Sequence, residues 1–228
     1  QFFAHDVFYL LKNPQAQRFQ NLLLFQQVCG AVDYAHKHGV IHRDLKPGNI
    51  IIGGADDVYV IDWGTAKYST SRSVGAGPLW LPNQFQPHDT IFGRVEGTPA
   101  YMSPEQASGG KAKITEQSDI YCLGAILYEI LTGHTPIVFQ GSLDALLAEI
   151  LQGKIQSPQK RFPQLTIPGD LNQIVMRCLA LQPSDRYASL TILVDDVNTF
   201  IEGSKERERS LMEAKRRTDL GRKLLQNE

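Results

Sequence analysis

The chain has 228 residues, a length that suits one domain or slightly more. Hydrophobic residues make up 42% and charged residues 21%, so the chain can bury a core and lacks the composition of a disordered tail. Lysine and arginine number 23 against 24 aspartates and glutamates. A formal net charge of -1 argues against nucleic-acid binding driven by bulk charge.

The sequence also argues against several other classes of protein. No apolar run reaches the roughly 20 residues of a membrane span, and no signal-peptide pattern opens the chain. The cysteines Cys29, Cys122 and Cys178 lie far apart and form no C-x-x-C pair. We therefore expect reduced cysteines in the core of a cytoplasmic protein, without a disulfide framework or a zinc site.

Hydrophobic periodicity predicts a mainly helical chain with a short β-rich region. Apolar residues at three- and four-residue steps predict a long helix from about residue 16 to His38, ended by Gly39. Three β-rich runs follow at 40–41, 49–52 and 58–61. The turn-forming segment 53–57 predicts a hairpin between the last two runs. Further helices are predicted at 118–131, 143–151, 171–179 and 190–201.

Two segments differ from this pattern. Residues 64–100 are rich in Gly, Pro, Ser and Thr and show no sustained periodicity, which is typical of a functional or mobile loop. Residues 203–228 hold eight basic and five acidic side chains, a net charge of +3. We interpret 1–202 as one domain and 203–228 as a charged helical tail.

The string His42-Arg43-Asp44-Leu45-Lys46-Pro47-Gly48-Asn49 lies between two predicted strands, and Asp62-Trp63-Gly64 begins thirteen residues later. Phosphoryl transfer needs a positioned hydroxyl, metal ions on the phosphates and charge stabilisation. An Asp can accept the hydroxyl proton and a Lys can face the γ-phosphate. An Asn and a second Asp can hold two magnesium ions. All four residue types occur here at predicted loop positions.

With these residues the chain resembles the eukaryotic-type protein kinase family, and most of all its bacterial members. The resemblance covers H-R-D-L-K-P-x-N, and D-W-G at the D-F-G position. Residues 97–105 resemble the substrate-binding loop and A-P-E motif, with Ser103 in place of Ala. Residues 119–124 resemble the central hydrophobic helix of the family. The resemblance implies a mainly α, α+β kinase-like fold, here the carboxy-terminal lobe with a short β-hairpin.

The resemblance also implies roles for the catalytic-loop residues. Asp44 would be the catalytic base, and Lys46 would stabilise the transferring phosphate. Asn49 and Asp62 would hold Mg²⁺, or Mn²⁺, on ATP. Lys46 together with Gly97 and Thr98 indicates the serine/threonine class, so protein substrates with Ser or Thr are expected.

For other motif residues the resemblance implies structural or regulatory roles. His42 is expected in the core, and Asp119 is expected to brace the catalytic loop. Glu105 and Arg186 are expected to form an ion pair, which would be hard to break if buried. Arg43 suggests control by phosphorylation of the activation segment, because a buried guanidinium needs an anionic partner.

The activation segment, 62–105, is longer than is usual in the family. Its candidate phosphoacceptors for self-phosphorylation include five hydroxyl residues. The apolar residues Leu79, Trp80, Leu81 and Phe85 either tuck the segment against the lobe or present a docking surface, and we favour tucking. The five hydroxyl residues are Ser69, Thr70, Ser71, Ser73 and Thr90.

The amino-terminal lobe of the family is not recognisable in this sequence. No G-x-G-x-x-G occurs, and neither Lys12 nor Lys37 lies in a V-A-I-K-like strand. We therefore expect that the amino-terminal lobe is absent, that 7–11 is a remnant of the helix after the hinge, and that Gln1 marks a cut.

Two hypotheses follow. In the first, the chain is part of an active serine/threonine kinase and gives no phosphate transfer by itself. In the second, it is a non-catalytic kinase-lobe module used for binding or as a scaffold. No nucleic-acid partner is expected, and membrane attachment only through sequence beyond this chain. The expected location is the cytoplasm, or the cytoplasmic face of a membrane if the parent chain continues into a membrane span.

Overall fold

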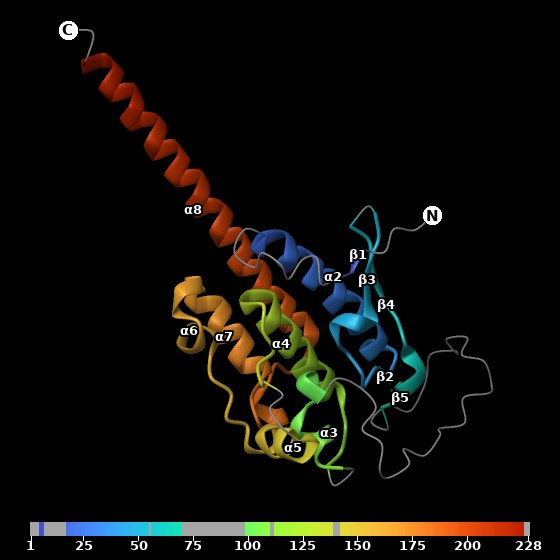
Figure 1. Cartoon of the computed structure of the whole chain (residues 1–228). Helices are drawn as coiled ribbons and strands as arrows, with labels where there is room; N and C mark the ends of the chain where they lie inside the picture. Colours follow the sequence, from blue (N-terminus) through green and yellow to red (C-terminus); the bar gives the residue numbers. More distant parts are fainter. Residues whose placement is uncertain are drawn as a thin grey trace.

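The computed structural model describes residues 5–6, 17–54, 56–69, 99–109, 112–138 and 142–225, the side chains of 5–6 and 219–225 excepted. Helices make up most of this part of the chain (Figure 1), as the sequence predicts. They are α2 (Arg18–Lys37), α3 (Pro104–Ala107), α4 (Glu116–Thr132), α5 (Leu143–Gln152), α6 (Pro158–Arg161), α7 (Gly169–Cys178) and α8 (Leu190–Leu225).

The described strands are short and form two antiparallel sheets. One sheet has the order β1 (His5–Asp6), β3 (Ile50–Ile52) and β4 (Val58–Val60). The predicted hairpin is confirmed, since Ile50 pairs with Val60 and Ile52 with Val58. The other sheet pairs β2 (Val40–Ile41) with β5 (Lys67–Tyr68), which the sequence did not predict. This second pairing joins the chain just before His42 to the chain just beyond Asp62.

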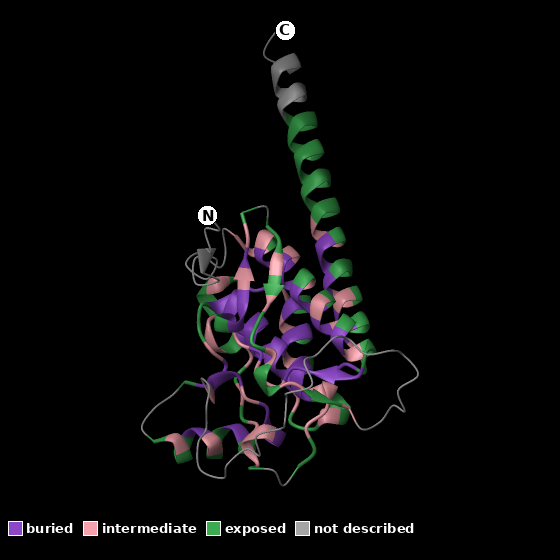
Figure 2. Ribbon diagram, turned by 90° about the vertical axis from the view of Figure 1, so that its right-hand side faces the viewer, coloured by how far each residue is buried: buried purple, intermediate pink, exposed green. Residues whose placement is uncertain are grey.

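Helix α4 is the centre of the fold, with α2 on one side and α7 on another (Figure 1). Every residue from Ser118 to Thr132 is buried, so the helix is covered around its circumference. A glycine allows α7 to approach closely. A Cβ atom on Gly124 would lie 2.4 Å from the Cβ of Cys178. Figure 2 shows buried residues concentrated in the body of the molecule.

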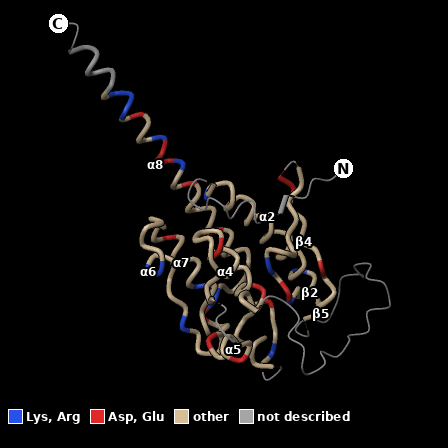
Figure 3. Tube along the Cα trace, in the orientation of Figure 1, with Lys and Arg blue, Asp and Glu red and all other residues tan. Residues whose placement is uncertain are grey.

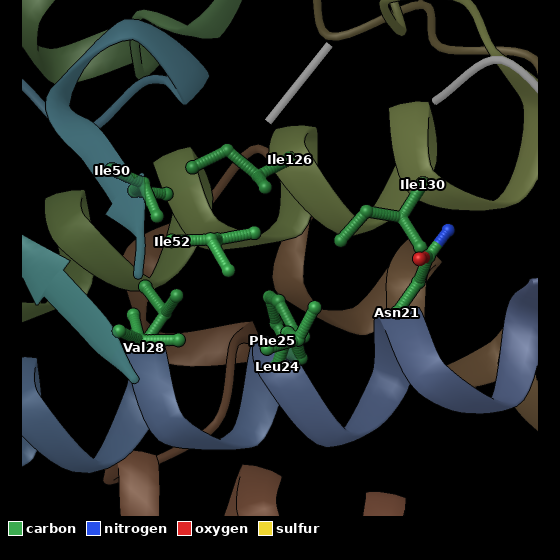
Figure 4. Close-up of a pocket in the computed structure, with 9 residues that line it drawn as sticks. Asn21, Leu24, Phe25, Val28, Ile50, Ile52, Ile126 and Ile130 are labelled. Carbon is green, nitrogen blue, oxygen red and sulfur yellow. The ribbon is translucent and has the colours of Figure 1, made fainter. Parts of the chain in front are cut away.

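The hairpin rests on α2 and α4 through apolar side chains. A small cavity of about 20 Å³ remains where Phe25, Ile52 and Ile130 approach one another (Figure 4). Its other lining residues are Asn21, Leu24, Val28, Ile50, Val58 and Ile126. A space of this size holds no organic ligand. The hairpin, which lies between the 42–49 loop and Asp62 in the chain, thus packs on a firm base.

Helix α2 ends where the sequence predicts. Gly39 has a φ of +76°, a conformation that glycine adopts without steric strain and that stops the helix. The predicted remnant of a hinge helix, 7–11, lies outside the described residues.

Helix α8 continues without a break from the domain into the charged tail. Its first turns pack against α2 and α7, whereas residues 205–218 are exposed (Figure 2). Acidic and basic residues alternate along this exposed part (Figure 3), and Arg217 pairs with Glu213 at 2.5 Å. Among the described helices, none is long and apolar enough to cross a bilayer.

Candidate active site

The loop from His42 to Asn49 joins β2 to β3 and turns sharply at Arg43. Arg43 has a φ of +73°, in the left-handed region that non-glycine residues seldom adopt. The carboxylate of Asp119, at the start of α4, accepts hydrogen bonds from the backbone N–H of His42 at 2.8 Å and of Arg43 at 2.9 Å. Leu45 is buried and anchors the middle of the loop. Asp119 therefore holds the loop in its turned conformation.

A histidine from α2 completes the surroundings of Asp119. The Nε2 atom of His36 lies 2.8 Å from Asp119 Oδ2, and both side chains are almost fully buried. A buried carboxylate is stable only when its oxygens are hydrogen-bonded. Here two backbone amides and an imidazole supply those hydrogen bonds.

Asp44, Lys46 and Asn49 meet at the mouth of the loop. Lys46 Nζ donates to Asp44 Oδ2 at 2.7 Å. Asn49 Nδ2 donates to the Asp44 carbonyl at 2.7 Å and to Asp44 Oδ2 at 3.1 Å. The side chains of Asp44 and Lys46 are 23% and 22% exposed, so solvent and a ligand can reach them. The two hydrogen bonds to the Asp44 carboxylate, from Lys46 and Asn49, both end on Oδ2. No described residue occupies Oδ1, which is available to a ligand.

Asp62 follows β4 and opens the turn Trp63–Thr65. Its carboxylate is exposed and makes no hydrogen bond or ion pair with the described residues. The turn is joined to the catalytic loop, because Thr65 Oγ1 donates to the His42 carbonyl at 3.1 Å. The residue before it is also held to the loop, since the Ile61 amide donates to the Asn49 carbonyl at 2.9 Å. An exposed carboxylate without a partner among the described residues can bind a cation.

A buried ion pair lies under the substrate-binding loop. Arg186 donates to both carboxylate oxygens of Glu105, at 2.6 and 2.9 Å. Ser118 Oγ also donates to Glu105, at 2.7 Å. Burial by itself would raise the pKa of Glu105, but these charge-assisted hydrogen bonds outweigh it and lower the pKa below its ordinary value. The carboxylate is therefore ionised in the neutral pH range.

The similarity of the sequence to known proteins identifies the family. The family model for the protein kinase domain matches residues 5–197. The chain belongs to the protein kinase family. The kinase fold expected from the sequence is thereby confirmed, with its helical, carboxy-terminal-lobe elements in the described residues.

Curated bacterial relatives carry the name serine/threonine-protein kinase PknD. The chain is 37% identical to the PknD of Chlamydia caviae over 187 residues, which cover 81% of this chain and 20% of the relative. It is 40% identical to the PknD of Protochlamydia amoebophila over 185 residues, which cover 80% of this chain and 18% of the relative. The chain thus spans about a fifth of the length of the relatives it matches.

A basic pocket of about 260 Å³ adjoins the kinase catalytic loop. Its lining includes Arg43 from the loop, Lys67 from β5 and Lys113 from the segment before α4. Arg43 Nη1 donates to the Thr65 carbonyl at 3.3 Å, whereas its buried Nε has no hydrogen-bond partner among the described residues. Three cationic side chains around one pocket, one with an unused donor, favour an anionic occupant.

Some predicted residues lie outside the described part of the kinase chain. These are Thr98 of the substrate-binding loop and the apolar residues at 79–81 and 85. Of the candidate phosphoacceptors, Ser69 is described and lines the basic pocket. The others, Thr70, Ser71, Ser73 and Thr90, lie outside the described residues.

The structure adds residues that the sequence analysis did not single out. His36 contacts Asp119, and Gln106 donates from Nε2 to the Arg43 carbonyl at 2.5 Å. Gln106 also accepts a hydrogen bond from the Ser103 amide at 3.0 Å, so it links the substrate-binding loop to the catalytic loop. A polar residue three positions after Ser103 at a helix start was the available signal for Gln106. A single histidine on an amphipathic helix gives no such signal.

Proposed function

We propose that the protein containing this chain transfers the γ-phosphate of ATP to Ser and Thr hydroxyls of proteins, with Asp44 as the catalytic base. The observation that carries the proposal is the orientation of Asp44. Lys46 and Asn49 both donate to its Oδ2 atom. Oδ1 is left to accept the hydrogen bond of a substrate hydroxyl and then its proton.

Lys46 has a second task in this proposal. Its ammonium group lies 2.7 Å from Asp44, within reach of a phosphoryl group that approaches the same hydroxyl. A positive charge there stabilises the negative charge on the transferring phosphoryl oxygens. The salt bridge to Asp44 holds Lys46 in place before the substrate arrives.

The donor atoms present fit magnesium. Asn49 uses its Nδ2 atom on Asp44, so its side-chain oxygen is available to a cation, and Asp62 offers a carboxylate. Oxygen donors of this kind suit Mg²⁺, which binds one or two protein groups together with phosphates and waters. The described residues hold no cluster of three or more His, Cys, Asp or Glu side chains suited to a metal. Bound Mg²⁺ on ATP would supply neutralisation of phosphate charge.

The serine/threonine class rests on two supports. Lys46 occupies the position that favours this class, and the relatives that match 80–81% of the chain are named serine/threonine-protein kinases. The free, buried cysteines and the need for ATP support a cytoplasmic site of action.

The basic pocket supports control by self-phosphorylation. A phosphate on the activation segment would be attracted to a pocket lined by Arg43, Lys67 and Lys113. Removal of phosphate from the active protein is expected to lower its turnover severalfold, and Arg43→Ala is expected to abolish this response. Equal turnover before and after phosphatase treatment would remove the proposal of phosphate control.

The alternative is a non-catalytic binding or scaffold module. An assay of radiolabelled phosphate transfer from ATP to protein, carried out with the full natural chain, distinguishes the kinase from the scaffold. We expect Asp44→Asn and Asp62→Asn each to lower turnover about 10²–10⁴-fold. Asp57→Asn, an exposed aspartate in the turn between β3 and β4, is the matched control and is expected to leave turnover unchanged. Retained turnover in both site variants would reject the catalytic roles of Asp44 and Asp62, whereas no transfer by the wild-type chain would favour the scaffold.

A further inference from the structure

Trp63 stands where the family motif has phenylalanine, directly after the proposed metal ligand Asp62. Asp62 itself has φ of +61° and ψ of +62°, in the left-handed region. Asp tolerates this conformation better than most non-glycine residues, but it is still less favourable than the right-handed one unless the surrounding structure supports it. The groups that hold the backbone around Asp62 therefore decide where its carboxylate points.

The indole of Trp63 makes one of these contacts. Its Nε1–H donates to the carbonyl of Val60 at 2.9 Å. The donor side chain and the acceptor carbonyl belong to residues three positions apart, so the hydrogen bond closes a ring that encloses Ile61 and Asp62. A phenylalanine at this position could pack in the same place but has no N–H to close the ring.

His42 holds the other side of the same ring. Its Nε2 atom lies 3.0 Å from the Ile61 carbonyl, and its ring packs against the Trp63 ring at a centroid distance of 4.5 Å. The amide of Ile61 donates to the Asn49 carbonyl at 2.9 Å. The backbone before Asp62 is thus fixed to the catalytic loop through Asn49 and His42.

The turn after Asp62 is equally tight. A Cβ atom on Gly64 would lie 3.2 Å from Asp62 Oδ1, so the carboxylate folds back over the turn and lies close to Gly64. The Ala66 amide donates to the Trp63 carbonyl at 3.1 Å and closes the turn. Between these two flanks, the indole hydrogen bond joins Val60 to Trp63 directly across Asp62.

We propose that Trp63 is a positioning residue whose indole N–H holds Asp62 in its left-handed conformation and so directs its carboxylate toward the metal on the nucleotide. The proposal deepens the proposed function and rests on it. Trp63 is only partly buried, so apolar packing alone does not account for its place at the surface end of the site.

The test uses the full natural chain and two variants. Trp63→Phe keeps an aromatic ring and removes the donor, and Trp63→3-benzothienylalanine keeps the ring shape and replaces the N–H by sulfur. Tyr59→Phe, which changes an exposed aromatic residue of β4 and leaves Trp63 intact, is the matched control. Affinity for Mn²⁺ in the presence of a non-hydrolysable ATP analogue is measured by electron paramagnetic resonance. The Mg²⁺ concentration for half-maximal phosphate transfer is the second readout.

Both Trp63 variants are expected to weaken Mn²⁺ binding and to raise the Mg²⁺ requirement about tenfold, which corresponds to about 1.4 kcal/mol. Turnover at saturating Mg²⁺ is expected to fall by less than about threefold, since the bound metal restores the geometry of Asp62. Tyr59→Phe should match the wild type in both readouts.

Wild-type Mn²⁺ affinity in both Trp63 variants would overturn the proposal. Wild-type affinity in the benzothienyl variant alone would also overturn it, because ring packing rather than the N–H would then be responsible. The Mn²⁺ titration does not depend on turnover. A wild-type protein that transfers no phosphate would therefore count against the proposed function and leave this result readable.

Discussion

Two sets of carboxylates surround the catalytic loop, and they differ in burial. Asp119 and Glu105 lie beneath the loop and are 0% and 5% exposed, whereas Asp44 and Asp62 lie at its mouth and reach solvent. The oxygens of the buried pair are occupied by hydrogen bonds from the protein. One oxygen of Asp44 and both oxygens of Asp62 are left without partners among the described residues.

This difference in burial distinguishes carboxylates that hold the loop in place from carboxylates that can act on a substrate or a cation. A carboxylate that is fully hydrogen-bonded inside the protein fixes backbone and side chains but has nothing left to offer a substrate. A carboxylate that is partly hydrogen-bonded and exposed is oriented and still able to take a proton or a cation. Removal of the first kind should lower stability, and removal of the second should lower turnover.

The largest effect on stability is expected from Arg186→Ala. All five N–H groups of Arg186 are used, on Glu105 and on the carbonyls of Gln117, Ala180 and Leu181. Its loss would leave a buried carboxylate unpaired, and the free energy of unfolding should fall by about 3–5 kcal/mol. Urea unfolding measures this. Arg217→Ala breaks an exposed pair on α8 and should change the value by less than about 0.5 kcal/mol.

Asp119→Asn tests the brace beneath the loop. An amide can replace one accepting oxygen but presents an NH₂ group to a donor on the other side, so we expect a loss of about 2–3 kcal/mol. Turnover should fall as well, because the turn at Arg43 loosens. Asp33→Asn removes an acid from the half-exposed pair with Lys37 and serves as the control. An Asp119→Asn protein as stable and as active as the wild type would show that Asp119 is not a brace.

Gly124→Ala tests whether α4 is a rigid base for both sets of carboxylates. The new Cβ would lie 2.4 Å from the Cβ of Cys178, so α4 and α7 must move apart. Overpacking of this kind destabilises by about 1–3 kcal/mol. Gly30→Ala, in helix α2 with nothing within 4 Å of the new atom, should instead stabilise by about 0.5–1 kcal/mol. Thermal unfolding of the two variants should therefore shift in opposite directions.

The smallest effect concerns pH and a second buried glutamate. Burial raises the pKa of Glu129, and the hydrogen bond from Tyr101 and the charge of His134 offset this only in part. The pKa of Glu105 is lowered instead. The partner of each glutamate thus decides the direction of its pKa shift.

The signs of the two pH effects are opposite. Glu105 contributes stability above the ordinary glutamate pKa of about 4.3, and this is lost as pH falls through its folded value. Glu129 contributes stability below about 4.3, and this is lost as pH rises through its folded value. Urea unfolding from pH 3 to 7 measures both effects. Glu105→Gln should reduce the fall in the free energy of unfolding toward acid pH, and Glu129→Gln should reduce its fall toward neutral pH. Unchanged slopes would contradict these pKa directions.

Local sequence patterns predicted much of the fold. The apolar spacing of α2, the glycine that ends it and the turn residues between β3 and β4 each act over a few positions, and the structure follows them. The pairing of β2 with β5 was not predictable in this way. Two-residue strands carry no periodicity, and their partner lies more than 25 residues away.

The candidate site divides in the same manner. Asp44, Lys46, Asn49 and Asp62 stand out because their spacing forms a motif. His36 and Lys113 are brought to the site by packing that no local pattern encodes. The helix-start pattern at Ser103 pointed to Gln106 as a capping residue, but not to its contact with the Arg43 carbonyl. The indole hydrogen bond of Trp63 depends on the left-handed backbone conformation of Asp62, which the sequence around Asp62 does not predict.

The most direct test of the account is Asp44→Asn in the full natural chain, with phosphate transfer and urea unfolding measured on the same preparation. We expect turnover to fall about 10²–10⁴-fold while the free energy of unfolding stays within about 0.5 kcal/mol of the wild type. Wild-type turnover, or a loss of turnover that only accompanies unfolding, would contradict the assignment of Asp44 as the base.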